Sequence, residues 1–342
     1  MHWKINRIGC CLKSKQIEAF FAYRIPDAAQ PKFFKGDFVK LEQPVILEKD
    51  EIIIHSFLGD EIYLLKNSVE INSEEFQLLD QGTDPDLVVA DENTYLEAFS
   101  KMKKVLDDGS FKKIILSRIK KVITQKNGLE IFNLLNVTYK NTFNYIFSSA
   151  ETGVWIGATP ELLLKADDHV VSTVSLAGTK PNDGFSEWTQ KEREEQKFVT
   201  DFILASFQEN KIAEIISSKT YTAKAGPVEH LKTDIHGKLE TENQIYALLK
   251  SLHPTPATCG IPKAEAQAKI VEVELHQRKF YTGYIGFNSD NVKYYFVNLR
   301  CMQLQNEHAY LYVGGGLTSA SIAEREWLET ERKAETLEKV LK

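Results

Sequence analysis

Hydrophobic and polar residues follow two different periods along the chain. Before residue 90, apolar runs such as PVILEKDEIIIHSFL and GDEIYLLKN are short and are separated by Gly-Asp pairs. This pattern predicts strands joined by tight turns. After residue 90 the first segment has a helical period, carried by Tyr95, Phe99, Met102 and Leu106. We therefore expect residues 1–90 to form a β-rich part of the scaffold and residues 91–342 to mix helices with strands.

Helical and extended segments then follow one another to the end of the chain. The periods predict a strand over 111–122, a helix near 129–141, strands over 142–149 and 153–159, a long helix from about Ser186 to Ser217, strands near 219–225 and 229–239, helices near 243–251 and 263–277, strands over 282–289, 292–303 and 308–316, and a terminal helix from about Ser321, where Ser321 and Glu324 fit a capping box. No repeat or linker separates these pieces. Strands that arrive in series with helices between groups favour one large α+β domain, with antiparallel sheets and helices packed outside.

Composition and charge narrow the possible functions. The chain has 342 residues and a net charge of −6, from 42 Lys and Arg against 48 Asp and Glu. Such a surface repels phosphate backbones, which argues against general nucleic-acid binding. No apolar run approaches the roughly 18 residues of a membrane span, and MHWKINRIGCCLKSK lacks the apolar stretch of a signal peptide. Four cysteines without a C-x-x-C pair favour a reduced, cytoplasmic protein.

Charged residues on the terminal helix form the first candidate site. Glu326, Glu329 and Lys333 are spaced i, i+3, i+7 and therefore share one helix face. The triplet Gly314–Gly316 comes just before this helix, and its missing side chains let a ligand approach the backbone closely. Two carboxylates in the first turns would attract a hard cation such as Mg²⁺. The alternative is a solvated Glu–Lys face, in which the ion pair adds little stability.

The long helix carries a similar carboxylate. Glu195 shares a stripe with the apolar residues Phe198, Val199 and Phe202. A lone carboxylate facing a core is costly unless a cation or a hydrogen-bond donor meets it. The alternative is that the first turn of the helix projects past the core. Together with Glu326 and Glu329, this residue would make a partial cage of the kind that Mg²⁺ accepts when substrate oxygens complete it.

Four more residues are candidates for acid–base catalysis or ligand binding because of the residues that surround them. Lys113 lies in a strand with apolar residues on both faces, so it is a candidate general base, although it also belongs to a run of cations typical of a solvated edge. Arg300 would pair with an anionic ligand such as a carboxylate. Glu161, beside three leucines, would have a raised pKa and act as a general acid, or would simply open a strand. His230 would hydrogen-bond a ligand or serve a structural role.

Eight ordered motifs carry a resemblance to a known family. They are ATPELLLK, SLAGTK, KEREEQKFV, HLKTDIHG, LHPTPATCG, RKFYTGYIG, FVNLRCMQL and GGGLTSASIAEREWLETERK. Over about residues 91–342 the chain resembles the chorismate-utilising enzymes, which include isochorismate, salicylate, anthranilate and aminodeoxychorismate synthases. The resemblance implies an α+β fold of large antiparallel sheets, dependence on Mg²⁺, and a chorismate-binding catalytic region over 91–342.

The resemblance also implies a role for each candidate residue. Lys113 would activate a water that attacks C2 of chorismate, and Glu161 would protonate the departing C4 hydroxyl. Glu195 and Glu326 would hold Mg²⁺, with Glu329 as a direct or water-mediated ligand. The remaining residues would bind the substrate: Arg300 and Tyr281 at the enolpyruvyl carboxylate, and Gly178, Thr179, His230, Gly314, Gly316 and Lys333 around the rest of the pocket.

Two positions indicate a branch of the family. The resemblance places the water-activating lysine of isochorismate and salicylate synthases at Lys113, a lysine that ammonia-using members lack. Aminodeoxychorismate synthases that form a covalent adduct carry a lysine where this chain has Ala177. The resemblance therefore favours a monomeric isochorismate synthase that serves menaquinone or siderophore synthesis without a glutamine amidotransferase subunit. The alternatives are a salicylate synthase, which would add pyruvate elimination, and a catalytically silent chorismate-binding protein.

Overall fold

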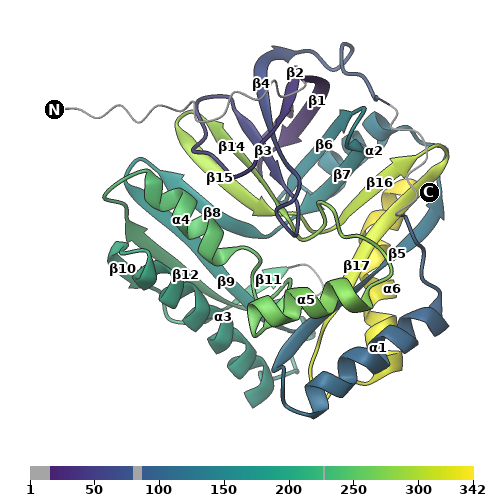
Figure 1. Cartoon of the computed structure of the whole chain (residues 1–342), viewed down its shortest axis with the longest axis vertical. Coiled ribbons are helices and arrows are strands. Elements are labelled where there is room, and N and C mark those ends of the chain that lie inside the picture. Colours follow the sequence, from purple (N-terminus) through teal and green to yellow (C-terminus); the bar gives the residue numbers. More distant parts are fainter. Residues whose placement is uncertain (1–15, 80–86, 226–227) are drawn as a thin grey trace.

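The computed structural model describes residues 16–79, 87–225 and 228–342, apart from the side chains of residues 179, 181, 191, 225 and 228 (Figure 1). The helices in this part are α1 (Glu92–Asp107), α2 (Gly128–Thr138), α3 (Gln190–Glu209), α4 (Asn243–Leu252), α5 (Lys263–Val273) and α6 (Ala323–Leu341). The strands are β1 (Ile17–Arg24), β2 (Lys32–Lys40), β3 (Ile52–His55), β4 (Ile62–Ile71), β5 (Lys113–Ile123), β6 (Phe143–Ser149), β7 (Gly153–Thr159), β8 (Leu162–Asp167), β9 (Val170–Pro181), β10 (Ala213–Ser217), β11 (Tyr221–Ala225), β12 (Val228–Lys238), β13 (Gly260–Ile261), β14 (Tyr284–Ser289), β15 (Val292–Val297), β16 (Cys301–Gln305) and β17 (His308–Leu317).

The strands of the described residues pair into one continuous antiparallel sheet. Followed through its hydrogen-bonded neighbours, the sheet runs β12-β9-β8-β15-β14-β3-β4-β2-β1-β6-β7-β16-β17-β5-β13, and β10 and β11 pair with β12. Strands β1–β4 occupy the middle of this order, so the N-terminal part and the rest of the chain share one sheet. The predicted single α+β domain with a large antiparallel sheet is confirmed.

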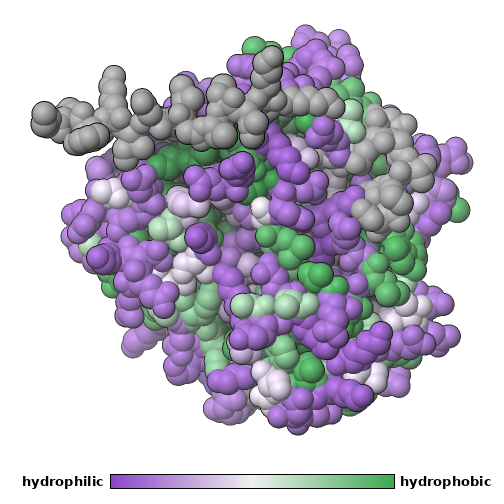
Figure 2. All heavy atoms as spheres, viewed as in Figure 1, coloured by the Kyte–Doolittle hydropathy of each residue, from purple (hydrophilic) through white to green (hydrophobic). Residues whose placement is uncertain are grey.

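Helices cover the two ends of the sheet. Figure 1 shows α3 and α4 beside the end formed by β8, β9 and β12, and α1 and α6 beside the end formed by β5 and β17. Buried aromatic rings fill the middle, where Phe143 stacks on Phe296 at 4.7 Å between ring centroids and Trp155 stacks on Tyr312 at 5.0 Å. Figure 2 shows polar side chains over most of one face, with apolar groups interspersed. No helix of the described residues is long and apolar enough to cross a membrane.

Two short connections lie side by side between the ends of the sheet, and we call them the crossings. One joins β7 to β8, and the other joins β15 to β16. Because β7 pairs with β16 and β8 pairs with β15, the two crossings are neighbours. The N–H of Val297 donates to the carbonyl of Glu161 at 2.9 Å, and the N–H of Ala158 donates to the carbonyl of Arg300 at 3.1 Å. The sheet therefore places Glu161 and Arg300 on neighbouring crossings.

Three sequence predictions about helix boundaries are wrong. The long helix ends at Glu209, and residues 213–217 form β10, because Lys211 at φ 55° turns the chain between them. The helix predicted over 263–277 ends at Val273. The terminal helix begins at Ala323 without a capping box, since the hydroxyl of Ser321 accepts from the N–H of Thr318 instead, at 3.1 Å.

Candidate active site

Lys113 lies at the start of β5 with its ammonium group in an ion pair. Its Nζ is 2.6 Å from Oε1 of Glu195 on α3, and its side chain is 15% exposed. The neighbouring strand β17 passes so close that a Cβ added to Gly316 would lie 2.6 Å from Cε of Lys113 and 3.3 Å from Nζ. A side chain on Gly316 would therefore displace the lysine. The structure brings the predicted base and one predicted metal ligand into direct contact.

Gln196 fixes the helix that carries Glu195. Its Oε1 accepts from the N–H of Ala177 at 2.8 Å, and its Nε2 donates to the carbonyl of Ser175 at 3.1 Å. Gln196 is 2% exposed and lies on the core side of α3 with Val199, whereas the side chain of Glu195 is 36% exposed. Of the two interpretations left open for Glu195, the one in which it faces the core is therefore wrong, because the buried stripe is displaced by one residue and leaves this carboxylate at its edge.

Glu161 lies on the crossing between β7 and β8, against a mostly apolar cavity of about 20 Å³. That volume holds about one water molecule. Burial raises the pKa of Glu161 to about 7, and the nearby Lys113 opposes part of this rise. A carboxyl with such a pKa is protonated in a useful fraction of molecules near neutral pH, which is what a general acid requires. The walls of the cavity are formed mainly by Leu163, Val174, Val199, Phe202, Leu252 and Val297.

A β-bulge in β9 places Gly178 beside α3. The pairing with β12 shifts there: His230 pairs with Thr179 and Leu231 with Ala177, so Gly178 is the extra residue. Its φ of +62° favours glycine, and an added Cβ would lie 3.0 Å from Cβ of Glu192. Nδ1 of His230 lies 3.3 Å from the carbonyl oxygen of Gly178. Burial and the nearby Arg300 lower the pKa of His230. Thr179 was predicted to bind the substrate, and its side chain lies outside the described part of the structure.

Arg300 and Lys333 join α6 to the sheet. The guanidinium of Arg300 donates to the carbonyl of Lys333 at 2.9 Å and to Oγ1 of Thr336 at 3.3 Å. Burial lowers the pKa of Arg300. Nζ of Lys333 donates in turn to the carbonyl of Gly314 at 2.8 Å. The hydroxyl of Tyr281 would lie 3.0 Å from a Cβ added to Gly314. The predicted substrate-binding residues Tyr281, Arg300, Gly314 and Lys333 thus form one chain of neighbours.

The carboxylates of α6 approach the glycine triplet at Gly315. A Cβ added to Gly315 would lie 3.4 Å from Oε2 of Glu326 and 3.7 Å from Oε1 of Glu329. Oε1 of Glu329 is also 2.6 Å from Nζ of Lys333. Among the described residues, no three His, Cys, Asp or Glu side chains form a group that could hold a metal ion. Two neighbouring carboxylates still suit Mg²⁺, which commonly takes one or two of them and fills its other positions with water and substrate oxygens.

The sequence did not reveal two features of the site. Gly315 is the member of the triplet that faces the α6 carboxylates, although the resemblance assigned a substrate-binding role only to Gly314 and Gly316. Glu274 and Arg278 form a buried ion pair beside β5. Their i, i+4 spacing was a visible signal, but the same spacing is common on exposed helix faces and does not indicate burial.

Similarity to known proteins agrees with this fold. The chain matches the family model of the chorismate binding enzymes over residues 58–342 and belongs to that family. It is 28% identical to isochorismate synthase EntC of Escherichia coli strain K12 over 239 residues, which are 66% of this chain and 61% of that protein. It is 27% identical to anthranilate synthase component 1 of Acetivibrio thermocellus over 254 residues, 70% of this chain and 51% of that protein.

A solved structure shares the fold over nearly the whole chain. The menaquinone-specific isochorismate synthase MenF of Escherichia coli superposes with a TM-score of 0.80 at 19% identity, covering 96% of this chain and 89% of that one. By sequence, the chain matches 61% of the length of EntC. The comparisons thus establish the family and the fold, and they include both isochorismate synthases and an anthranilate synthase component 1.

Proposed function

We propose that this chain is an isochorismate synthase, an isomerase that converts chorismate to isochorismate with Mg²⁺. The observation that carries the proposal is the environment of Lys113, which is 15% exposed, touches the glycine triplet and lies near Glu161. A lysine and a carboxyl whose pKa is about 7 supply the proton acceptor and the proton donor that the reaction needs. A lysine at this place is also what the resemblance assigns to the water-using branch.

The reaction needs one proton accepted and one proton donated. Lys113, in its neutral amine form, would take a proton from the water that attacks C2 of chorismate and become the ammonium that pairs with Glu195. The ring double bonds shift as the C4–O bond breaks, and Glu161 would give its proton to the departing oxygen, which leaves as water. Each of these roles typically contributes about 10²–10⁴-fold to the rate. Glu326 and Glu329, the neighbouring carboxylates beside Gly315, would hold Mg²⁺, which supplies charge neutralisation at the ring carboxylate, and Glu195, now paired with Lys113, would join them as a third ligand when substrate binds.

The remaining site residues would orient the substrate. The planar guanidinium of Arg300, with the hydroxyl of Tyr281, suits the enolpyruvyl carboxylate because an arginine fork matches two carboxylate oxygens. Backbone groups at Gly178, Gly314 and Gly316, together with Thr179, His230 and Lys333, would surround the ring. Arg300 donates to groups on α6, so binding would add the substrate carboxylate to a side chain that the fold already holds in place.

Product analysis tests the proposal. The purified chain is incubated with chorismate and Mg²⁺, and products are separated by chromatography while salicylate is followed by its fluorescence. We expect chorismate to be converted to isochorismate without release of pyruvate. Salicylate and pyruvate would instead identify a salicylate synthase, and anthranilate formed with added ammonium would identify an ammonia-using enzyme. Chorismate bound but unchanged in excess Mg²⁺ would leave a binding protein.

The cellular role follows from the product. We propose that the chain works as a cytoplasmic monomer, without an amidotransferase subunit, and supplies menaquinone or siderophore synthesis. Expression in two bacterial strains that lack their own isochorismate synthases, one requiring menaquinone and one requiring a catecholate siderophore, would distinguish these roles by which strain regains growth. Light scattering during chromatography would measure the mass, for which we expect the 39.0 kDa of a single chain.

A further inference from the structure

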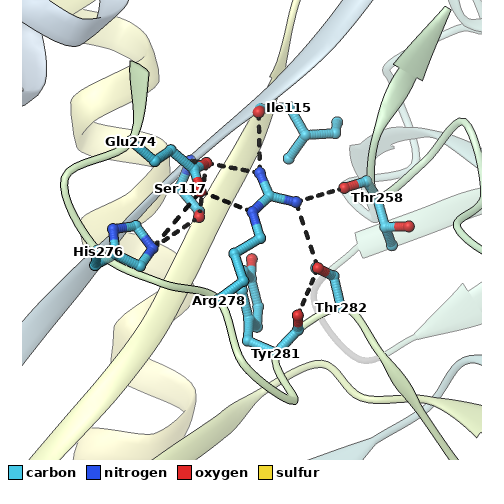
Figure 3. A network of polar contacts seen from close by, with 8 residues as sticks. All are labelled: Ile115, Ser117, Thr258, Glu274, His276, Arg278, Tyr281 and Thr282. Carbon is cyan, nitrogen blue, oxygen red and sulfur yellow. Dashed lines mark hydrogen bonds and ion pairs between the residues drawn. The ribbon is translucent and has the colours of Figure 1, made fainter. Parts of the chain in front are cut away.

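Glu274 and Arg278 form an ion pair that is almost fully removed from solvent (Figure 3). Their side chains are 1% and 2% exposed. Nη2 of Arg278 is 2.6 Å from Oε1 of Glu274, and Nε is 2.8 Å from Oε2, so the guanidinium meets both carboxylate oxygens. Both residues lie between the end of α5 and the start of β14. We call these two residues the strand-edge pair because they bond to backbone groups at the outer edge of β5.

The strand-edge pair completes the outer edge of β5. Strand β13 pairs with the first two residues of β5, and the carbonyl of Cys259 then accepts from the N–H of Ile115 at 2.8 Å. Beyond this point side chains replace the neighbouring strand. The carbonyl of Ile115 accepts from Nη2 of Arg278 at 3.1 Å, and the N–H of Ser117 donates to Oε1 of Glu274 at 2.7 Å. Because buried backbone groups must be paired, the strand-edge pair substitutes for a missing strand here.

One guanidinium also connects three chain segments. Its contacts reach β5 at Ile115, the loop before β13 at Thr258, and the segment before β14 at Thr282 (Figure 3). Five acceptors match the five N–H donors of an arginine. They are Oε1 and Oε2 of Glu274, the carbonyls of Ile115 and Thr258, and Oγ1 of Thr282. A lysine has three donors and no planar fork, so it would leave some of these groups unpaired.

The segments held in this way carry residues of the active site. Lys113 lies two residues before Ile115 on β5, and Ser117 pairs with Gly314 across the ladder to β17. The N–H of Tyr281 donates to the carbonyl of Arg278 at 2.8 Å, which ties the backbone of the tyrosine to that of the pair. The hydroxyl of Ser117 donates to Oε1 of Glu274 at 2.9 Å. The pair is thus connected to the predicted base and to two predicted substrate-binding residues, and the guanidinium of Arg278 also lies 5.9 Å from the centroid of the Tyr281 ring.

We propose that the strand-edge pair positions Lys113 and Tyr281 for the chemistry on chorismate, a role that rests on the function proposed above. Stability alone is a weak reason for such a pair, since buried ion pairs are often replaced by apolar residues without loss. What an apolar pair cannot supply is the set of directed bonds that fixes the outer edge of β5. A displacement of about 1 Å in a catalytic group costs on the order of 10²-fold in rate.

The experiment compares the variant R278K with the matched control R24K. Arg24 is also a buried arginine, 3% exposed, and it donates to the carbonyls of Ala28 and Lys140. It belongs to β1, which carries no residue of the site. We expect R278K to lower kcat by roughly 10–100-fold while KM for chorismate changes by less than about threefold, as for a group that affects the reacting state more than binding. R24K should keep kcat, although both variants lose thermal stability.

The outcomes separate this role from the proposed function. A wild-type chain that leaves chorismate unchanged would overturn the function and this role together. An active wild type whose R278K variant keeps normal kcat, or whose R24K variant loses as much kcat as R278K, would overturn the positioning role alone. If R278K does not fold, E274Q is measured in its place, because glutamine keeps the shape and one acceptor oxygen for Ser117; a folded E274Q with unchanged kcat would equally overturn the role.

Discussion

The ammonium of Lys113 and the carboxylate of Glu195 are 2.6 Å apart, although 82 positions separate them in the chain. This contact joins the proposed general base to a proposed metal ligand. It also gives the ammonium a partner, so that a ligand competing for Glu195 would change the surroundings of the base. The two functions that the sequence suggested separately are therefore coupled in the fold.

Replacing Lys113 tests the assignment of the base. K113A should lower kcat by at least about 10²-fold, the lower range for a general base. Stability should change little, because partly exposed ion pairs contribute about 0–1 kcal/mol. Steady-state rates with chorismate and thermal unfolding measure the two effects. K112A, at the exposed neighbouring lysine, is the control and should retain activity; a K113A variant of near-normal rate would remove Lys113 from this role.

Glu161 should produce a pH dependence of the rate. Burial raises its pKa to about 7, and a general acid acts in its protonated form, so kcat/KM, which reports the pKa of the free enzyme, should fall as pH rises through about 7. E161Q should lack this limb and lose about 10²–10⁴-fold in rate. E265Q, at an exposed glutamate of α5, should keep the wild-type profile. A wild-type profile that is flat between pH 6 and 8.5 would contradict the assignment.

The same residue should affect stability with a defined sign. The pKa of Glu161 is raised in the folded chain from the ordinary value of 4.5 to about 7, so the folded state holds a proton that the unfolded state has released. Raising the pH from about 4.5 to 7 should therefore reduce the stability that Glu161 contributes. Urea unfolding of wild type and E161Q across this range measures the difference, which should grow in favour of E161Q as pH rises.

Glu326 should control the requirement for Mg²⁺. E326Q removes a charged oxygen that lies beside Gly315, and the half-saturating Mg²⁺ concentration should rise by about tenfold or more, because even indirect partners of a bound metal typically account for 10–100-fold. E324Q is the matched control: Glu324 lies in the same first turn of α6 and is exposed. Identical Mg²⁺ titrations for wild type and E326Q would show that Glu326 is not a ligand.

How much of this site the sequence could reveal depends on whether the signal is local. The helical period of Tyr95, Phe99, Met102 and Leu106 correctly predicted α1, and all four are buried. The apolar residues after Lys211 continued a helix-like spacing, so only the positive φ at Lys211 reveals the turn into β10. The burial of Glu274 and Arg278 depends on their contacts with Ile115 and Ser117 of β5, which lie over 140 positions earlier in the chain. No local pattern contains that information.

Two buried imidazoles should make the chain sensitive to acid. His55 and His253 are 8% and 9% exposed, and their ring centroids are 5.0 Å apart. Both rings pack against Tyr284. Burial lowers the pKa of His55 to about 4 and that of His253 to about 3, from an ordinary value of 6.5. Below pH 6.5 the unfolded chain therefore takes up protons that the folded chain excludes, and stability falls as pH drops towards 4.

The slope of this loss can be attributed to single residues. Each imidazole should contribute up to about 1.4 kcal/mol per pH unit below pH 6.5. H253F keeps an aromatic ring beside His55 and Tyr284 but cannot be protonated, so the unfolding free energy from urea titrations should fall less steeply between pH 6.5 and 4.5 than in wild type. H236Q, at an exposed histidine of β12, should follow the wild-type curve. Equal slopes for H253F and wild type would mean that His253 is protonated in the folded chain, against the burial of its ring.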